Sequence, residues 1–173
     1  MAECLHGNNN KMKILKNYGF NTNKLFYTIA EIGINHGGSL DRAMQLIKSA
    51  SKTGVDSVKF QTYITEKRVG KNSPIFDILK KCELPFKDFE KLKDFSKEEN
   101  LEFFSTPFDE ESVDCLESIG VDIYKIASFD VVNHRLLRRI ANTKKTVVMS
   151  VGMANLEEIR KAFRILKSKT KKI

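Results

Sequence analysis

Two lysines stand inside apolar segments that have the length of β-strands: Lys59 in "SVKFQTY" and Lys125 in "IYKIASF". An ammonium group inside such a strand is unfavourable unless a negative charge accompanies it. A bound anion would supply that charge, and so would a buried carboxylate, for instance in a pair between Glu31 and Lys59. The two interpretations are compatible, and together they indicate a place where an anionic small molecule binds.

Other apolar segments also end in polar residues, and the carboxyl ends of parallel strands are where such folds gather their functional groups. Hydroxyl and ammonium donors in this arrangement suit phosphate and carboxylate groups. The candidates in chain order are Glu31, Asn35, His36, Lys59, Gln61, Ser105, Thr106, Phe108, Lys125, Ser128, Asp130 and Ser150.

Three of these candidates have two interpretations each. His36 is either a ligand or a hydrogen-bonded structural residue. Asp130 is either a proton carrier or the anion that stabilises the N-terminus of the next helix. Phe108, together with Phe129, either forms a shelf for a substrate or belongs to the core.

The elements that position these residues alternate between strand and helix patterns. Strands are predicted at 26–34, 57–63, 101–108, 123–129 and 146–152, and helices at 39–54, 86–100, 110–120, 133–143 and 155–168. We expect Ser39 to cap the first helix and Asn155 with Glu158 to form a capping box, whereas Gly54 and Gly120 end helices. The pattern predicts parallel strands, either in an open doubly wound sheet or in part of a (β/α)8 barrel. The insertion at 64–85 is expected to hold a short helix at 76–81.

Composition excludes several classes of protein. The chain has 173 residues, of which 41% are hydrophobic and 30% charged, as in a globular protein. No apolar run approaches the roughly 18 residues of a membrane helix, and the N-terminus lacks a signal-peptide core, so we expect a cytoplasmic protein. Cys4, Cys82 and Cys115 lack the spacing of a disulfide framework or a zinc site. The net charge of +8 is spread along the chain without a nucleic-acid-binding signature.

Five segments carry a family resemblance: "AEIGINHGG", "VKFQTY", "FFSTPFDEESVDCLESIG", "YKIAS" and "MSVGMANLEEI". They resemble the sialic acid synthases, which make N-acetylneuraminate, pseudaminate or legionaminate. The resemblance implies a (β/α)8 barrel that condenses phosphoenolpyruvate with an N-acetylated amino sugar. The product is a nine-carbon 2-keto-3-deoxy acid, and phosphate is released.

The same resemblance implies roles for individual residues. Glu31 and Asp130 would be catalytic. The residues implied to bind phosphoenolpyruvate are Lys59, Ser105, Thr106, Lys125, Ser128 and Ser150. The chain reads Ser128-Phe129-Asp130 where many relatives have Ser-Gly-Glu, and Val151 where they usually have Thr, so the identity of the sugar stays open.

The resemblance also implies a longer protein than this chain. A complete barrel needs about 250 residues. We therefore expect an N-terminal extension at 1–24 and an incomplete barrel domain at 25–173, without the last strands and the C-terminal antifreeze-like domain. The Mn²⁺ or Mg²⁺ that the family uses would have its ligands in those later strands, so no metal ligand is expected here. The full-length family is expected to form homodimers, and this chain alone is expected to be inactive.

Two other functions remain open from the residues. A Schiff-base aldolase could use Lys59 or Lys125 as its nucleophile. A non-catalytic remnant could bind anions or pair with a partner that completes the barrel. A nucleic-acid-binding role is a weak third alternative.

Overall fold

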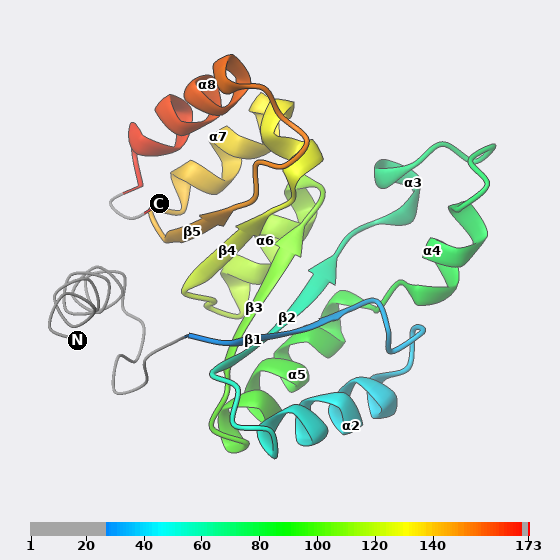
Figure 1. Cartoon of the computed structure of the whole chain (residues 1–173). Helices are drawn as coiled ribbons and strands as arrows, with labels where there is room; N and C mark the ends of the chain where they lie inside the picture. Colours follow the sequence, from blue (N-terminus) through cyan, green and yellow to red (C-terminus); the bar gives the residue numbers. More distant parts are fainter. Residues whose placement is uncertain (1–26, 171–172) are drawn as a thin grey trace, which may run out of the picture.

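The computed structural model describes residues 27–170 and residue 173, so the extension expected at 1–24 lies outside the described residues. The described part contains a sheet of five parallel strands in the order β1-β2-β3-β4-β5. The strands are β1 (Ile29–Gly33), β2 (Ser57–Thr62), β3 (Glu102–Pro107), β4 (Ile123–Ile126) and β5 (Thr146–Met149). Sequential order excludes the doubly wound alternative, and the fold is a partial (β/α)8 barrel (Figure 1).

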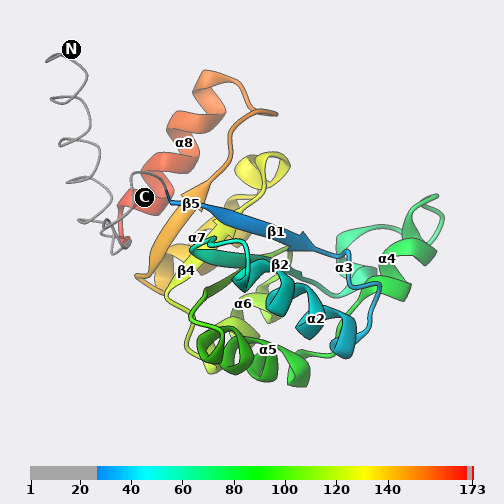
Figure 2. The same cartoon turned by 60° about the horizontal axis from the view of Figure 1, so that its bottom comes forward.

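Each strand is followed in sequence by a long helix, and these helices lie on one side of the curved sheet (Figure 2). They are α2 (Leu40–Ser51), α5 (Phe86–Glu98), α6 (Glu110–Ser118), α7 (His134–Asn142) and α8 (Leu156–Lys167). The predicted caps are confirmed: the Ser39 side chain accepts from the Arg42 N–H, and Asn155 with Glu158 forms the capping box. None of the helices in the described ranges is both long and apolar enough to cross a membrane.

The face of the sheet under the helices forms the hydrophobic core. Strand side chains alternate between faces, so every second residue of β2, β3 and β4 points to the helices. Phe60 and Phe103 stack there with ring centroids 5.4 Å apart. The remaining core residues of these strands are Val58, Tyr124 and Ile126, none more than 1% exposed. The opposite face is the inner face of the partial barrel.

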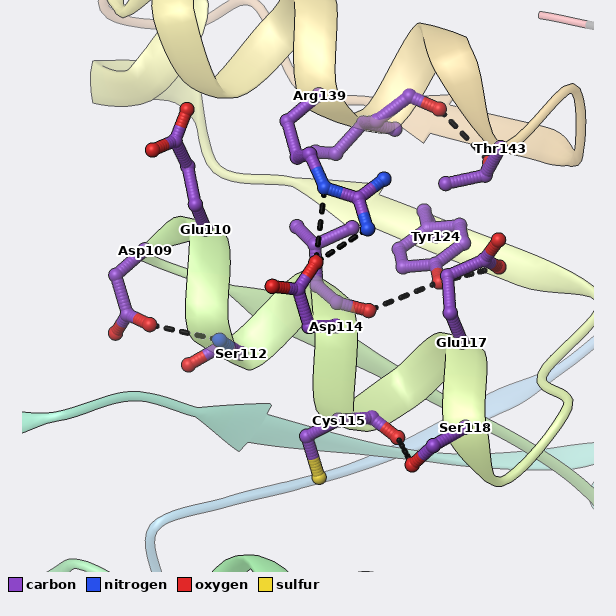
Figure 3. A network of polar contacts seen from close by, with 12 residues as sticks. Asp109, Glu110, Ser112, Asp114, Cys115, Glu117, Ser118, Tyr124, Arg139 and Thr143 are labelled. Atoms are coloured by element: carbon purple, nitrogen blue, oxygen red, sulfur yellow. Dashed lines mark hydrogen bonds and ion pairs between the residues drawn. The ribbon is translucent and has the colours of Figure 1, made fainter.

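Polar contacts attach α6 to the sheet and α7 to α6 (Figure 3). The Tyr124 hydroxyl on β4 donates to Glu117 of α6 at 2.9 Å. Arg139 Nε of α7 donates to Asp114 of α6, also at 2.9 Å. Because Tyr124 is held on the helix side, its neighbour Lys125 must point to the inner face.

The insertion after β2 forms α3 (Thr65–Arg68) and α4 (Phe76–Cys82), which project from the carboxyl edge of the sheet (Figure 1). The predicted short helix at 76–81 is confirmed as α4. A second apolar cluster of Tyr63, Leu79 and Phe108 holds this insertion, and the Tyr63 hydroxyl donates to the Leu79 carbonyl at 2.8 Å. The Thr65 N–H donates to a carboxylate oxygen of Glu83 at 2.8 Å.

All five strands are shorter than predicted, and β5 ends at Met149 rather than at residue 152. The segment 123–129 is a strand only as far as Ile126, and Ser128–Val132 forms a 3-10 helix, η1. The first strand is interrupted at Gly33, where the pairing with β2 shifts register. Gly33 has φ +56°, and a Cβ there would lie 3.0 Å from a carboxylate oxygen of Glu31. A glycine therefore permits both the bulge and the position of the Glu31 side chain.

Candidate active site

Lys59 is held on the inner face by two neighbouring strands. Its Nζ lies 2.6 Å from Glu31 Oε2 on β1 and donates to Thr106 Oγ1 on β3 at 3.2 Å. Lys59 is 7% exposed and Thr106 2%. The pair that the sequence suggested between Glu31 and Lys59 is therefore present. The Glu31 side chain remains 55% exposed, so a ligand can approach it from solvent.

Lys125 occupies the same face two strands away. Its Nζ donates to Ser150 Oγ at 2.7 Å and to the Ile126 carbonyl at 2.6 Å. Burial and, to a smaller extent, the positive charge of Lys59 lower the pKa of Lys125 to about 8, although Glu31 acts in the opposite direction. Lys59 on β2 and Lys125 on β4 therefore both lie on the inner face of the sheet. We call the group Glu31, Lys59, Thr106, Lys125 and Ser150 the anion basin.

Ser105 does not join the anion basin, which corrects the expectation from sequence. It is paired in register with Tyr124 and is completely buried. Its hydroxyl lies 2.7 Å from the hydroxyl of Thr62, also completely buried. Because side chains alternate along β3, Thr106 faces the basin and Ser105 faces the helices.

Asn35 and His36 follow β1 in a turn but differ in exposure. Asn35 is exposed. His36 is 1% exposed, stacks on Phe60 of the helix-side core, and accepts the Gly38 N–H on Nδ1 at 3.1 Å. Burial lowers the pKa of His36, and a backbone hydrogen bond to Gly33 opposes this change. This packing and the Nδ1 hydrogen bond favour the structural interpretation of His36, while its buried Nε2 has no hydrogen-bond partner among the described residues.

Ser128 and Asp130 lie in η1, directly after β4. Ser128 is half-buried and opens this helix. Asp130 is 6% exposed, and its Oδ1 accepts from Asn133 Nδ2 at 3.4 Å. Burial raises the pKa of Asp130 to about 6, while Asn133 and the charge of Arg68 lower it. A carboxyl group with such a pKa exchanges protons near neutral pH, as a proton carrier must.

Arg68 is a site residue that the sequence analysis missed. Its Nη1 donates to Gln61 Oε1 at 3.0 Å, and its guanidinium carbon lies 3.8 Å from the centroid of the Phe108 ring. Phe108 in turn stacks on Phe129 with ring centroids 5.7 Å apart. The signal that could have identified Arg68 was its position five residues after the predicted strand 57–63, at the start of the insertion.

The residues of the basin do not form a set of metal ligands. Glu31 is already engaged by Lys59, and residues 27–170 contain no group of three or more His, Cys, Asp or Glu side chains that could hold a metal ion. The divalent metal that the resemblance implies does not fit the donors described here, and we derive no chemical step through it. A cavity of about 600 Å³ lies elsewhere, between α7 and α8, and shares no residue with the basin.

Comparison with known proteins decides the family. Residues 46–173, most of the chain, match the NeuB family. The chain belongs to the NeuB family. It is 38% identical over 152 residues to the N,N'-diacetyllegionaminic acid synthase of Campylobacter jejuni, which covers 80% of this chain and 46% of that one. It is 32% identical over 162 residues to the pseudaminic acid synthase of the same species, with 86% and 47% covered.

A solved structure agrees with the family assignment. The crystal structure of N-acetylneuraminic acid synthetase from Leptospira borgpetersenii superposes with a TM-score of 0.80 at 40% identity. The match covers 83% of this NeuB-family chain and 51% of that protein. The chain thus spans about half the length of the relatives it matches.

Proposed function

We propose that this NeuB-family chain carries the phosphoenolpyruvate-binding part of a sialic-acid-type synthase site. The enzyme would condense phosphoenolpyruvate with an N-acetylated amino sugar to a nine-carbon 2-keto-3-deoxy acid. The observation that carries the proposal is the anion basin, in which Lys59 and Lys125 are held on the inner face of the barrel by Glu31, Thr106 and Ser150. Two ammonium groups on one face of the sheet suit a ligand with two negative groups, and phosphoenolpyruvate has a carboxylate and a phosphate.

The basin residues have complementary tasks in this proposal. Lys59 and Lys125 bind the two anionic groups, and the hydroxyls of Thr106 and Ser150 orient the ammonium groups to which they are bonded. Glu31 balances the charge of Lys59 before the donor arrives and then lies beside the bound donor. Its exposure permits that rearrangement.

The reaction forms one bond between two carbons. C3 of phosphoenolpyruvate bonds to the aldehyde carbon of the open-chain sugar, and the aldehyde oxygen takes up a proton. Water adds at C2 and phosphate leaves, so that C2 becomes a ketone. Asp130 is the group whose pKa of about 6 suits delivery of that proton at neutral pH.

The test is a calorimetric titration of the 173-residue chain with phosphoenolpyruvate. Lys59→Met and Lys125→Met should each weaken binding by about tenfold or more, because each removes a charged hydrogen-bond donor. Lys161→Met on α8, a lysine far from the basin, is the matched control and should leave binding unchanged. Failure of the unaltered chain to bind phosphoenolpyruvate would refute the proposal. It would also be refuted if both basin variants bound phosphoenolpyruvate as tightly as the unaltered chain does.

One observation favours a second function, a Schiff-base aldolase. With a pKa of about 8, Lys125 holds a measurable fraction of neutral amine at pH 7.5, as an imine-forming lysine requires. The amine would add to a ketone such as pyruvate and release water, and borohydride would reduce the imine to a stable secondary amine. Mass spectrometry of the chain after incubation with pyruvate and borohydride decides this point. A labelled Lys125 supports the aldolase, and an unlabelled chain excludes it.

A further inference from the structure

The positive charge of the chain is concentrated near its C-terminal end, which corrects the expectation that it is spread along the chain. Residues 133–173 contain 12 Lys and Arg but two Glu and no Asp, whereas residues 1–132 contain 18 Lys and Arg against 20 Asp and Glu. The net charges of the two parts are therefore +10 and −2, which together give the +8 of the whole chain. Most of the cations in 133–173 lie on or beside α7 and α8, which are neighbours in the structure (Figure 1).

Helix α7 uses its cations differently on its two sides. Towards α6, Arg135 forms an ion pair with Glu110, and Arg139 forms one with Asp114. Towards α8, the guanidinium of Arg138 makes no hydrogen bond or ion pair with any described residue. The first two arginines therefore connect helices, whereas the third is left without a negative partner in the described part of the chain.

The cavity of about 600 Å³ between α7 and α8 brings four cations together, and we call it the cationic groove. Among the described residues, its lining includes Arg138, Lys161, Arg164 and Lys169 and no carboxylate. Lys161 and Arg164 are three residues apart on α8 and therefore share one face of that helix. Lys169 Nζ donates to Asn142 Oδ1 at 2.8 Å and so connects the C-terminal ends of the two helices.

The stability of the two helices accounts for only part of this arrangement. Basic residues in the last turn of a helix offset its partial negative charge, and Arg164 lies in the last turn of α8. Arg138 and Lys161 lie in the middle of their helices, where this effect is small. Arg164 Nε donates to the Arg160 carbonyl at 3.4 Å, which leaves its two Nη groups without a partner among the described residues. The groove therefore holds charged donors that helix stability does not explain.

Charge and size together define the ligand that suits the cationic groove. Four like charges around one cavity repel each other, and a bound polyanion removes that repulsion. A cavity of this volume has the size of a small-molecule site, so the ligand must carry several negative charges in a short length. Linked phosphate groups have that charge density, and a guanidinium binds two phosphate oxygens at once.

We propose that the cationic groove between α7 and α8 binds a small molecule with two or three linked phosphate groups. Arg138 and Arg164 bind the phosphates from the two helices, and Lys161 and Lys169 neutralise the remaining charge. The groove lies among the helices, on the opposite side of the sheet from the anion basin, and shares no residue with it (Figure 2). It is therefore a second site, and it does not depend on the proposed function.

The test is a calorimetric titration of the 173-residue chain with sodium tripolyphosphate in about 0.15 M NaCl, which screens weak surface attraction. We expect saturable binding at one site. Arg138→Gln and Arg164→Gln should each weaken it about fivefold or more, because each removes a charged pair of donors. Arg160→Gln, on α8 but outside the groove, is the matched control and should change the dissociation constant less than about twofold.

The remaining outcomes decide against the inference. Arg138 and Arg164 are exposed, so their replacement should preserve the fold, which far-UV circular dichroism of each variant checks. Absence of tripolyphosphate binding would overturn the inference, and so would equal binding by the unaltered chain and both arginine variants, which would place the ligand elsewhere. A single-stranded RNA of about 20 nucleotides is titrated in parallel. If it bound more than about a hundredfold tighter than tripolyphosphate and lost affinity in Arg138→Gln, the groove would be a nucleic-acid surface and the inference would fail.

Discussion

Replacing Lys125 with Met should make the protein more stable and, at the same time, weaken its binding of phosphoenolpyruvate by about tenfold or more. In the folded protein, burial and the charge of Lys59 lower the pKa of Lys125 from its ordinary value of 10.5 to about 8. At about 1.36 kcal/mol per pH unit, this difference disfavours the charged form by about 3.4 kcal/mol. Because the side chain is only half-buried, solvent screening reduces the expected gain to about 1–2 kcal/mol.

The pH dependence distinguishes this cause from improved packing. A lysine whose pKa is lower in the folded state than in the unfolded state destabilises the fold. This destabilisation is complete at pH values below the folded-state pKa. That effect is relieved as the pH rises from about 8 towards 10.5, because the folded protein loses the proton first. The advantage of Lys125→Met should therefore be largest at pH 7 and shrink steadily by pH 10.

The assay is urea unfolding of both proteins at pH 7, 8, 9 and 10, with the difference in free energy of unfolding taken at each pH. Taking the difference cancels the titration of groups that the two proteins share. The lost hydrogen bond to Ser150 lowers the gain at every pH but does not change its slope. A difference that stays constant from pH 7 to 10 would show that the ammonium group is not destabilised in the fold, and the argument for an anion site would lose its basis.

Three further changes have directions that the structure sets. Gly38→Ala should lower the free energy of unfolding by about 2–4 kcal/mol, because a Cβ there would lie 2.2 Å from a backbone oxygen of α4 and φ is +80°. The measurement is thermal unfolding, and Gly70→Ala, which has open space around it, is the control. Asp130→Asn should stabilise the fold by about 1–3 kcal/mol at pH 7.5, because the charged carboxylate is destabilised in the fold, as its raised pKa of about 6 indicates. The gain should shrink as the pH falls from 6 to 4. Urea unfolding measures it, and a gain that persists at pH 4 would contradict the explanation. Glu31→Gln should leave phosphoenolpyruvate binding intact or tighter by calorimetry, because it frees Lys59 from its 2.6 Å partner, and weaker binding would show that Glu31 contacts the donor favourably.

The secondary structure was largely predictable because its signals are local. Ser39 and Asn155 cap helices through their own neighbours in sequence, and the apolar spacing of α5 and α6 places one face of each helix in the core. The predicted strand at 123–129 was too long, since the turn into η1 depends on how Asp130 and Val131 are buried against the rest of the fold.

The sequence by itself determined which residues carry charge into the barrel, since a lysine among apolar strand residues is unusual in any fold and alternation assigns its face. Only the tertiary structure decided which neighbours those residues meet. Ser105 and Thr106 are adjacent and chemically alike, yet one bonds to Thr62 under the helices and the other to Lys59 in the basin. Arg68 stacks on Phe108 only because the insertion that carries α3 packs against the end of β3. Contacts across such distances along the chain depend on packing, and packing is a property of the whole fold that no single stretch of sequence contains.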